Sequence, residues 1–111
     1  MDFDEYQKEA AKTGFYDTDD KTYVMMYLCL GIAGESGEVI EKIKKVIRND
    51  AGELSEEKRK AIGGEIGDVL WYLAELSRTL GLSFNDIAKA NIEKCADRAK
   101  RGVIKSEGDT R

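Results

Sequence analysis

Two pairs of acidic residues have the spacing of a helical metal site. Glu35 and Glu38 are three residues apart, and so are Glu65 and Asp68. In a helix, a separation of three turns the second side chain by about 60° and raises it by about 4.5 Å, so each pair projects from one face. Both pairs interrupt apolar stripes, where carboxylates repel one another and resist the loss of water. A positive charge among them would relieve both costs.

The available side chains narrow the choice of metal. The chain has no His, and its two cysteines, Cys29 and Cys95, lie apart from the acids and are expected to be reduced thiols. Four carboxylates without imidazole or thiolate form an oxygen-only site, which suits Mg²⁺ or Mn²⁺ and not Zn²⁺. A di-iron bundle normally uses Glu-x-x-His pairs, so the absence of His argues against it. The alternative is that the acids are simply exposed.

The apolar periodicity predicts that both motifs lie on long helices. The expected helices cover residues 2–13, 22–48, 55–80 and 83–101. The expected N-caps are Asp19 or Asp20, then Ser55 and Ser83, and Gly81 is expected to follow the third helix. There is no strand pattern and no Pro. We therefore predict an all-α fold, a helical bundle with two long antiparallel helices that is completed by oligomerisation.

Composition sets the scale of the protein and excludes some partners. The 111 residues suffice for one domain, assigned to residues 1–102, with a polar tail at residues 103–111. A core of this size is modest, which favours oligomerisation. The net charge of −4 argues against a nucleic-acid partner. No apolar run reaches the roughly 20 residues that span a membrane, and the acidic N-terminus is unlike a signal peptide, so we expect a cytoplasmic protein.

Six glycines fall inside the two long helices, where each costs about 1 kcal/mol relative to Ala. Close approach of the helices would explain them, and so would room beside the acids for metal and phosphates; packing alone is the alternative. They are Gly31, Gly34, Gly37, Gly63, Gly64 and Gly67.

The acidic motifs also resemble a known family. GIAGESGEVIEKIKK (31–45) followed by GEIGDVLWYLAELS (64–77) is similar to the ExxE…ExxD signature of the MazG-like, all-α nucleoside triphosphate pyrophosphohydrolases. The ending NIEKCADRAKRGVIKSEGDTR (91–111) resembles the basic fourth helix and Gly-Asp tail of that family. The resemblance covers residues 24–111, and the order and spacing of the two motifs make it specific.

The resemblance implies an activity and a set of site residues. Family members hydrolyse the α–β phosphate bond of a nucleoside triphosphate to a monophosphate and pyrophosphate, with a bound divalent metal. By similarity, Mg²⁺ would be held by Glu35, Glu38, Glu65 and Asp68. Substrate contacts would come from Tyr72, Asn91, Lys94 and Arg98. The family also implies a homodimer or homotetramer with sites near the subunit interfaces.

One departure and several alternatives stay open. Many family members have a further Glu where this chain has Gly34, so the number of metal ions is open, and we take Glu38 as the base that activates water. Glu41, followed by lysines, is read as surface charge. Trp71 is expected in the core, and Tyr72 either packs or contacts the nucleotide. The alternatives to nucleotide-pool house-cleaning are a narrow dUTP- or dCTP-directed pyrophosphatase and a non-catalytic helical dimerisation module.

Overall fold

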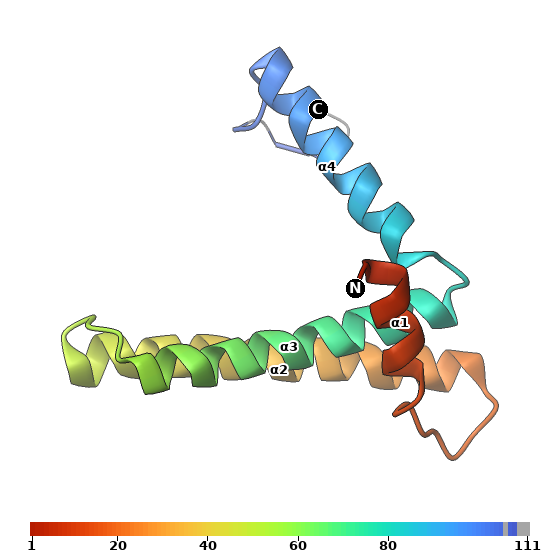
Figure 1. Cartoon of the computed structure of the whole chain (residues 1–111), viewed down its shortest axis with the longest axis horizontal. Coiled ribbons are helices and arrows are strands. Elements are labelled where there is room, and N and C mark those ends of the chain that lie inside the picture. Colours follow the sequence, from red (N-terminus) through yellow and green to blue (C-terminus); the bar gives the residue numbers. More distant parts are fainter. Residues whose placement is uncertain (106, 109–111) are drawn as a thin grey trace.

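The computed structural model describes residues 1–105 and 107–108 and confirms the predicted all-α class. No strand occurs in this part of the chain (Figure 1). The four helices are α1 (Phe3–Ala11), α2 (Lys21–Asp50), α3 (Glu56–Thr79) and α4 (Phe84–Arg101).

Side-chain caps define where the helices begin. The Asp20 carboxylate accepts hydrogen bonds from the backbone N–H groups of Thr22 and Tyr23 at the start of α2. Ser55 and Ser83 accept in the same way from the third residue that follows each of them. Each bond satisfies an N–H that has no partner inside its helix, which explains why the predicted caps are correct.

The C-terminal end of α2 lies slightly later in the chain than the sequence predicts. The helix continues to Asp50 instead of stopping at Arg48, so Asn49 does not break it. It ends where Ala51 and Gly52 both adopt positive φ, 55° and 80°. A left-handed residue closes a helix because its backbone turns out of the helical path. The short connection that results brings α3 back beside α2.

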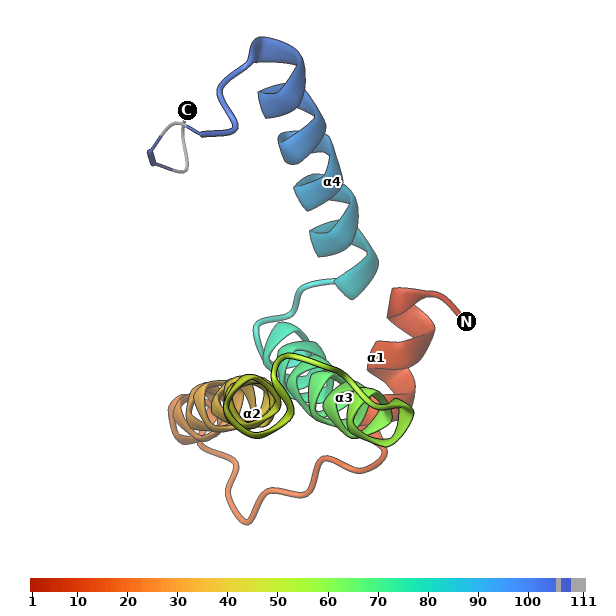
Figure 2. The ribbon, with the colours of Figure 1, turned by 90° about the vertical axis from the view of Figure 1, so that its left-hand side faces the viewer.

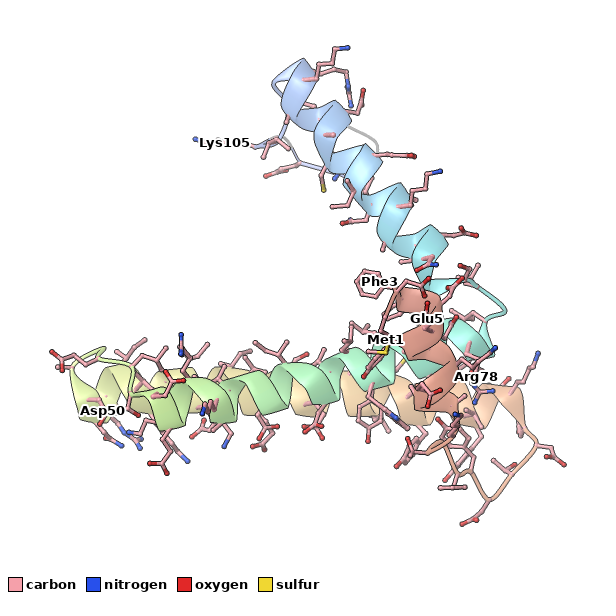
Figure 3. All side chains as sticks on the ribbon, viewed as in Figure 1. Met1, Phe3, Glu5, Asp50, Arg78 and Lys105 are labelled. Carbon is pink, nitrogen blue, oxygen red and sulfur yellow. The ribbon has the colours of Figure 1, made fainter. Side chains whose placement is uncertain are left out.

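The helices α2 and α3 form a long antiparallel hairpin, as predicted. Two views at right angles show them side by side along their length (Figures 1 and 2). Leu28 is fully buried along α2, and Val24 and Val46 are nearly so. Asp50 and Arg78 lie at opposite ends of the hairpin (Figure 3). Residues on the facing sides of these helices are therefore held at a fixed register.

A second, small core forms where α1 and α4 meet the end of α3. Its buried members are Ala10, Ala74 and Phe84, with Tyr6, Leu70 and Trp71 packed against them. The ring of Phe3 meets the ring of Phe84 edge-on, with centroids 5.1 Å apart. Aromatic pairs favour this arrangement. The core thus ties the first helix to the start of the last one.

Polar groups on α1 complete this junction. The Asp4 carboxylate accepts hydrogen bonds from the Ser83 hydroxyl at 2.8 Å and from the Asn85 backbone N–H at 2.9 Å. The Gln7 amide donates to the Leu82 carbonyl at 2.9 Å. Beyond this junction α4 leaves the hairpin and does not contact α2 (Figures 1 and 2). In this view side chains project from both edges of α4 (Figure 3).

The C-terminal region is described only in part. Gly102, with φ 70°, follows α4 and ends it. The predicted polar tail, residues 103–111, includes residues 106 and 109–111, which lie outside the described part of the chain. Among the four helices, none combines the length and the apolar character needed to cross a membrane.

Only one of the six helical glycines is required by close packing. A Cβ atom on Gly31 would lie 2.2 Å from Cε1 of Tyr72, so the tyrosine ring occupies the place of a side chain. A Cβ atom on any of the other five would meet nothing within 4 Å: Gly34, Gly37, Gly63, Gly64 and Gly67. The expectation of close helix approach is therefore confirmed at Gly31 alone.

We expect Gly31→Ala to destabilise the protein by about 1–3 kcal/mol, because the added methyl group must displace the Tyr72 ring. The matched control is Gly63→Ala on the neighbouring helix, where the space is open. That change is expected to stabilise the helix by up to about 1 kcal/mol. Urea unfolding measures both, and equal effects of the two substitutions would contradict the close packing at Gly31.

Candidate metal centre

The hairpin brings three of the four predicted acidic ligands together. Glu35 comes from α2, and Glu65 and Asp68 come from α3. One carboxylate oxygen from each lies within 4.8 Å of the other two. We call these three residues the acidic cluster. Glu35 and Glu65 are half-buried and Asp68 is exposed, so the cluster lies at the edge of the hairpin seam, open to solvent on one side.

Glu38 lies outside this group. It is exposed on α2, one turn beyond Glu35. Its charge still reaches the cluster, because it is one of the causes that raise the pKa of Glu35. Its roles as the fourth ligand and as the base therefore stay predictions.

The acidic cluster carries unfavourable negative charge. The pKa of Glu35 is raised, first by loss of solvent and then by the charges of Asp68 and Glu65. One cation lies close by, since Nζ of Lys42 is 3.6 Å from Oε1 of Glu65. A single lysine opposite three carboxylates leaves the cluster with excess negative charge.

An open pocket of about 370 Å³ adjoins the cluster. Its walls are Thr13, Glu35, Asp68, Trp71 and Tyr72. The pKa of the Tyr72 hydroxyl is raised by burial, then by a hydrogen bond with Tyr27 and by the charges of the two acids. Tyr72 thus packs against Gly31 and also borders the pocket, so the two roles considered for it are compatible.

Trp71 and Thr13 give this pocket a wall that the sequence did not predict. Trp71 packs against the small core, as expected, but also lines the pocket. Its indole Nε1–H donates a hydrogen bond to the Thr13 hydroxyl oxygen at 2.9 Å. Thr13 lies just after α1 and is not part of any recognisable sequence motif. Nothing in its local sequence could have shown that it approaches the acids.

The three predicted residues of α4 are not brought to the acidic cluster within one chain. Asn91 and Lys94 are exposed and Arg98 is buried. All three lie on a helix that contacts α1 and α3 but not α2. Their predicted contacts with substrate stay predictions.

The chemistry of the acidic cluster fits a hard divalent cation. Every donor is a carboxylate oxygen, the ligand type that Mg²⁺ and Mn²⁺ prefer. The pKa of Glu35 is raised first by loss of solvent and then by the neighbouring negative charges, and a bound cation would relieve both costs. The adjoining pocket is lined mainly by polar groups, and the rings of Trp71 and Tyr72 lie beside the acids in its wall.

We expect Glu35→Gln to raise the thermal midpoint of the metal-free protein near neutral pH. The folded protein holds a proton on Glu35 more tightly than the unfolded chain does. The ionised carboxylate therefore destabilises the fold, increasingly as the pH rises through its raised pKa. Differential scanning calorimetry with EDTA, at about pH 4 and about pH 8, should show a gain at the higher pH and little at the lower.

Glu41→Gln is the matched control for this experiment. Glu41 lies on the same helix, and its pKa is lowered chiefly by a hydrogen bond from Lys44. Its substitution should therefore not raise the midpoint. A lower midpoint for Glu35→Gln at both pH values would contradict the repulsion within the acidic cluster.

Comparisons with known proteins identify the family of the chain. The profile described as "MazG nucleotide pyrophosphohydrolase domain" matches residues 25–103. The chain is similar to the "Gene 37 protein" of Mycobacterium phage L5, with 35% identity over 114 residues that cover 100% of each chain. No solved structure matches the chain significantly. Since the profile covers well over half of the chain, and includes both acidic motifs, this protein belongs to the MazG nucleotide pyrophosphohydrolase family.

Proposed function

We propose that the protein is a Mg²⁺-dependent pyrophosphohydrolase that converts ribo- or deoxyribonucleoside triphosphates to monophosphates and pyrophosphate, as nucleotide-pool house-cleaning. One observation carries the proposal: the acidic cluster adjoins a pocket that is lined by Trp71 and Tyr72. A triphosphate needs divalent cations, and a nucleoside can pack against aromatic rings. The cluster and the pocket offer these two kinds of site next to each other, and membership of the family supports the same activity.

The roles of individual residues follow from their positions. When bound, the metal would neutralise phosphate oxygens and help to orient the attacking water. Glu35, Glu65 and Asp68 would hold it, since their oxygens already lie together. Glu38, one turn away and exposed, is free to accept a proton from water, which is the role we propose for it. The Tyr72 ring would contact the sugar or base.

The substitutions Glu65→Gln and Glu38→Gln test these roles separately. Glu65→Gln should weaken Mn²⁺ binding in calorimetry and lower kcat by at least about 100-fold. Glu38→Gln should lower kcat to a similar degree, because the base is lost, while Mn²⁺ still binds through the other three acids. Weaker Mn²⁺ binding in this variant would instead assign Glu38 as the fourth metal ligand. Both should keep the wild-type far-ultraviolet circular dichroism. Glu41→Gln serves as the control, because Glu41 pairs with Lys44 on the surface, and it should keep wild-type activity.

Activity should be measured as pyrophosphate release from the canonical ribo- and deoxyribonucleoside triphosphates, dUTP and modified nucleotides, with Mg²⁺ and with chelator. Release that needs metal and leaves a monophosphate would support the proposal. Strong preference for dUTP or dCTP would narrow it to a directed pyrophosphatase. The absence of release from every nucleotide, in a folded sample with no measurable metal binding, would favour the non-catalytic dimerisation module. Full activity of Glu65→Gln would refute the site assignment.

We also propose that the functional unit is a homodimer or homotetramer. An apolar groove of about 390 Å³ runs between α2 and α3 and is lined almost wholly by apolar side chains. Ile40, Ile66 and Leu73 on its walls are exposed, although isolated chains usually bury such residues when they cluster. A second copy covering this groove would supply the core that one chain lacks. Within such an assembly, we propose that Asn91, Lys94 and Arg98 contact substrate held at the acids of a neighbouring chain.

We expect Ile40→Glu to shift the protein towards the monomer. The residue is 66% exposed within one chain, so the added charge should leave the helix intact and act on the interface. Light scattering after size exclusion, across a series of concentrations, measures the mass. Ile40→Leu keeps the volume and should keep the wild-type mass. A monomeric wild-type protein, or equal masses for both variants, would contradict the proposed oligomer.

A further inference from the structure

Glu75 on α3 is a buried charge that neither the acidic motifs nor the proposed chemistry uses. Its exposed fraction is 0%. Its two oxygens accept hydrogen bonds from the Arg78 guanidinium at 2.7 and 2.9 Å. Oε1 also accepts a hydrogen bond from the Tyr16 hydroxyl at 2.8 Å. We call Tyr16, Glu75 and Arg78 the Glu75 cluster.

The protonation states of Glu75 and Tyr16 favour strong hydrogen bonds within this cluster. Burial by itself raises the pKa of Glu75, but the hydrogen bonds from Arg78 and Tyr16 outweigh it, so the pKa is lowered. The pKa of Tyr16 is raised by burial and by its bond to the carboxylate. At neutral pH the carboxylate is therefore ionised and the phenol keeps its proton. Hydrogen bonds to an ionised partner are stronger than those between neutral groups.

The Glu75 cluster contacts the segment that joins α1 to α2, residues 12–20, at Gly14 and Tyr16. A Cβ atom on Gly14 would lie 2.0 Å from Oε1 of Glu75, so the backbone of this segment rests directly on the carboxylate. The neighbouring residue Thr13 accepts the hydrogen bond from Trp71 and lines the pocket beside the acids. Glu75 thus fixes the backbone next to a residue of the pocket wall.

A series of contacts between aromatic rings also connects this cluster to Tyr72 and Trp71 in the pocket wall. The Tyr16 ring meets the Tyr27 ring edge-on, with centroids 6.1 Å apart. Tyr27 in turn lies 6.5 Å from Tyr72, between ring centroids. The rings of Tyr72 and Trp71 are 5.0 Å apart. The hydrogen bond from the Tyr16 hydroxyl to Glu75 therefore holds one end of a series of contacting rings, and the other end of the series lines the pocket.

A buried carboxylate is a costly means of packing alone. Moving a charge out of water is unfavourable, and an apolar residue of similar volume often serves as well or better for stability. A carboxylate differs from an apolar residue because its oxygens accept hydrogen bonds, and these bonds fix the positions of the donor groups. That property matters where a neighbouring wall must keep its geometry.

We propose that Glu75 and Tyr16 are positioning residues for the nucleotide pocket: their hydrogen bond fixes residues 13–16 so that Thr13, Trp71 and Tyr72 keep their places beside the acidic cluster. The inference rests on the proposed function, since it takes this pocket as the place of the nucleoside. Neither residue touches the reacting atoms. Their loss should therefore weaken substrate binding and leave the chemical step nearly unchanged.

The variant Tyr16→Phe tests the inference, because it removes one oxygen atom and keeps the ring. The control is Tyr23→Phe, which removes the same atom from a tyrosine that is 61% exposed. Trp71 is the single tryptophan of the chain, so its fluorescence reports on the pocket wall directly. Acrylamide quenching of Trp71 without nucleotide should increase by about twofold in Tyr16→Phe and stay unchanged in the control.

Kinetics provide the second measurement. For whichever nucleotide of the panel the wild-type protein hydrolyses fastest, Tyr16→Phe should raise KM by about tenfold and keep kcat within about twofold. Glu75→Gln should raise KM further, and adding Tyr16→Phe to it should have little extra effect, because both act through one bond. Comparison of the thermal midpoints shows whether each variant is folded at the assay temperature.

The two proposals fail in different ways. If the wild-type protein hydrolyses no nucleotide, the proposed function is overturned, and the positioning role is then judged by Trp71 quenching alone. If Tyr16→Phe matches Tyr23→Phe in both quenching and KM, the positioning role is overturned even in an active enzyme. A lower thermal midpoint for Tyr16→Phe with unchanged quenching and KM would reduce the Glu75 cluster to a structural anchor.

Discussion

Three carboxylates held together at the seam of one helical hairpin are the constraint that the rest of the structure must accommodate. Glu35, Glu65 and Asp68 come from two helices and lie within 4.8 Å of one another. Loss of solvent and the charges of the neighbouring acids both raise the pKa of Glu35, so the apolar seam of the hairpin must offset the cost of holding these charges there. Among the six glycines inside the hairpin helices, only Gly31 makes an obligatory close approach, to Tyr72, and it belongs to the same stretch of the hairpin. Stability and the site are thus in opposition along one pair of helices, as is usual where function requires charge.

The division of the fold into two cores has a physical basis. The hairpin is held by its own seam, whereas α1 and α4 are held by a few aromatic and polar contacts at one end of α3. Much apolar surface on α2 and α3 is left uncovered in one chain. A chain of 111 residues cannot enclose such long helices by itself, because its surface is large relative to its volume.

The parts of the structure that could be predicted are those decided by local chemistry. Apolar periodicity and the capping residues Asp20, Ser55 and Ser83 located the helices, and the spacing of the acids predicted that they share faces. The direction of α4 depends on contacts between residues about eighty positions apart, which no local pattern reveals. Glu75 was equally hidden, because a glutamate three residues before Arg78 resembles an ordinary exposed helical pair. Its burial follows from Gly14 and Tyr16, far away in the sequence.

The junction between the first and last helices has a consequence for how such a chain can diverge. Asp4 and Gln7 contact residues 82–85, so a span of four residues in α1 orients the whole of α4. Substitutions there would act on the direction of the C-terminal helix and, through the bond from Gln7 to the Ala74 carbonyl, on the adjoining end of α3. The two ends of the chain should therefore vary together among relatives. Such an arrangement lets selection change what surrounds the acids in small steps.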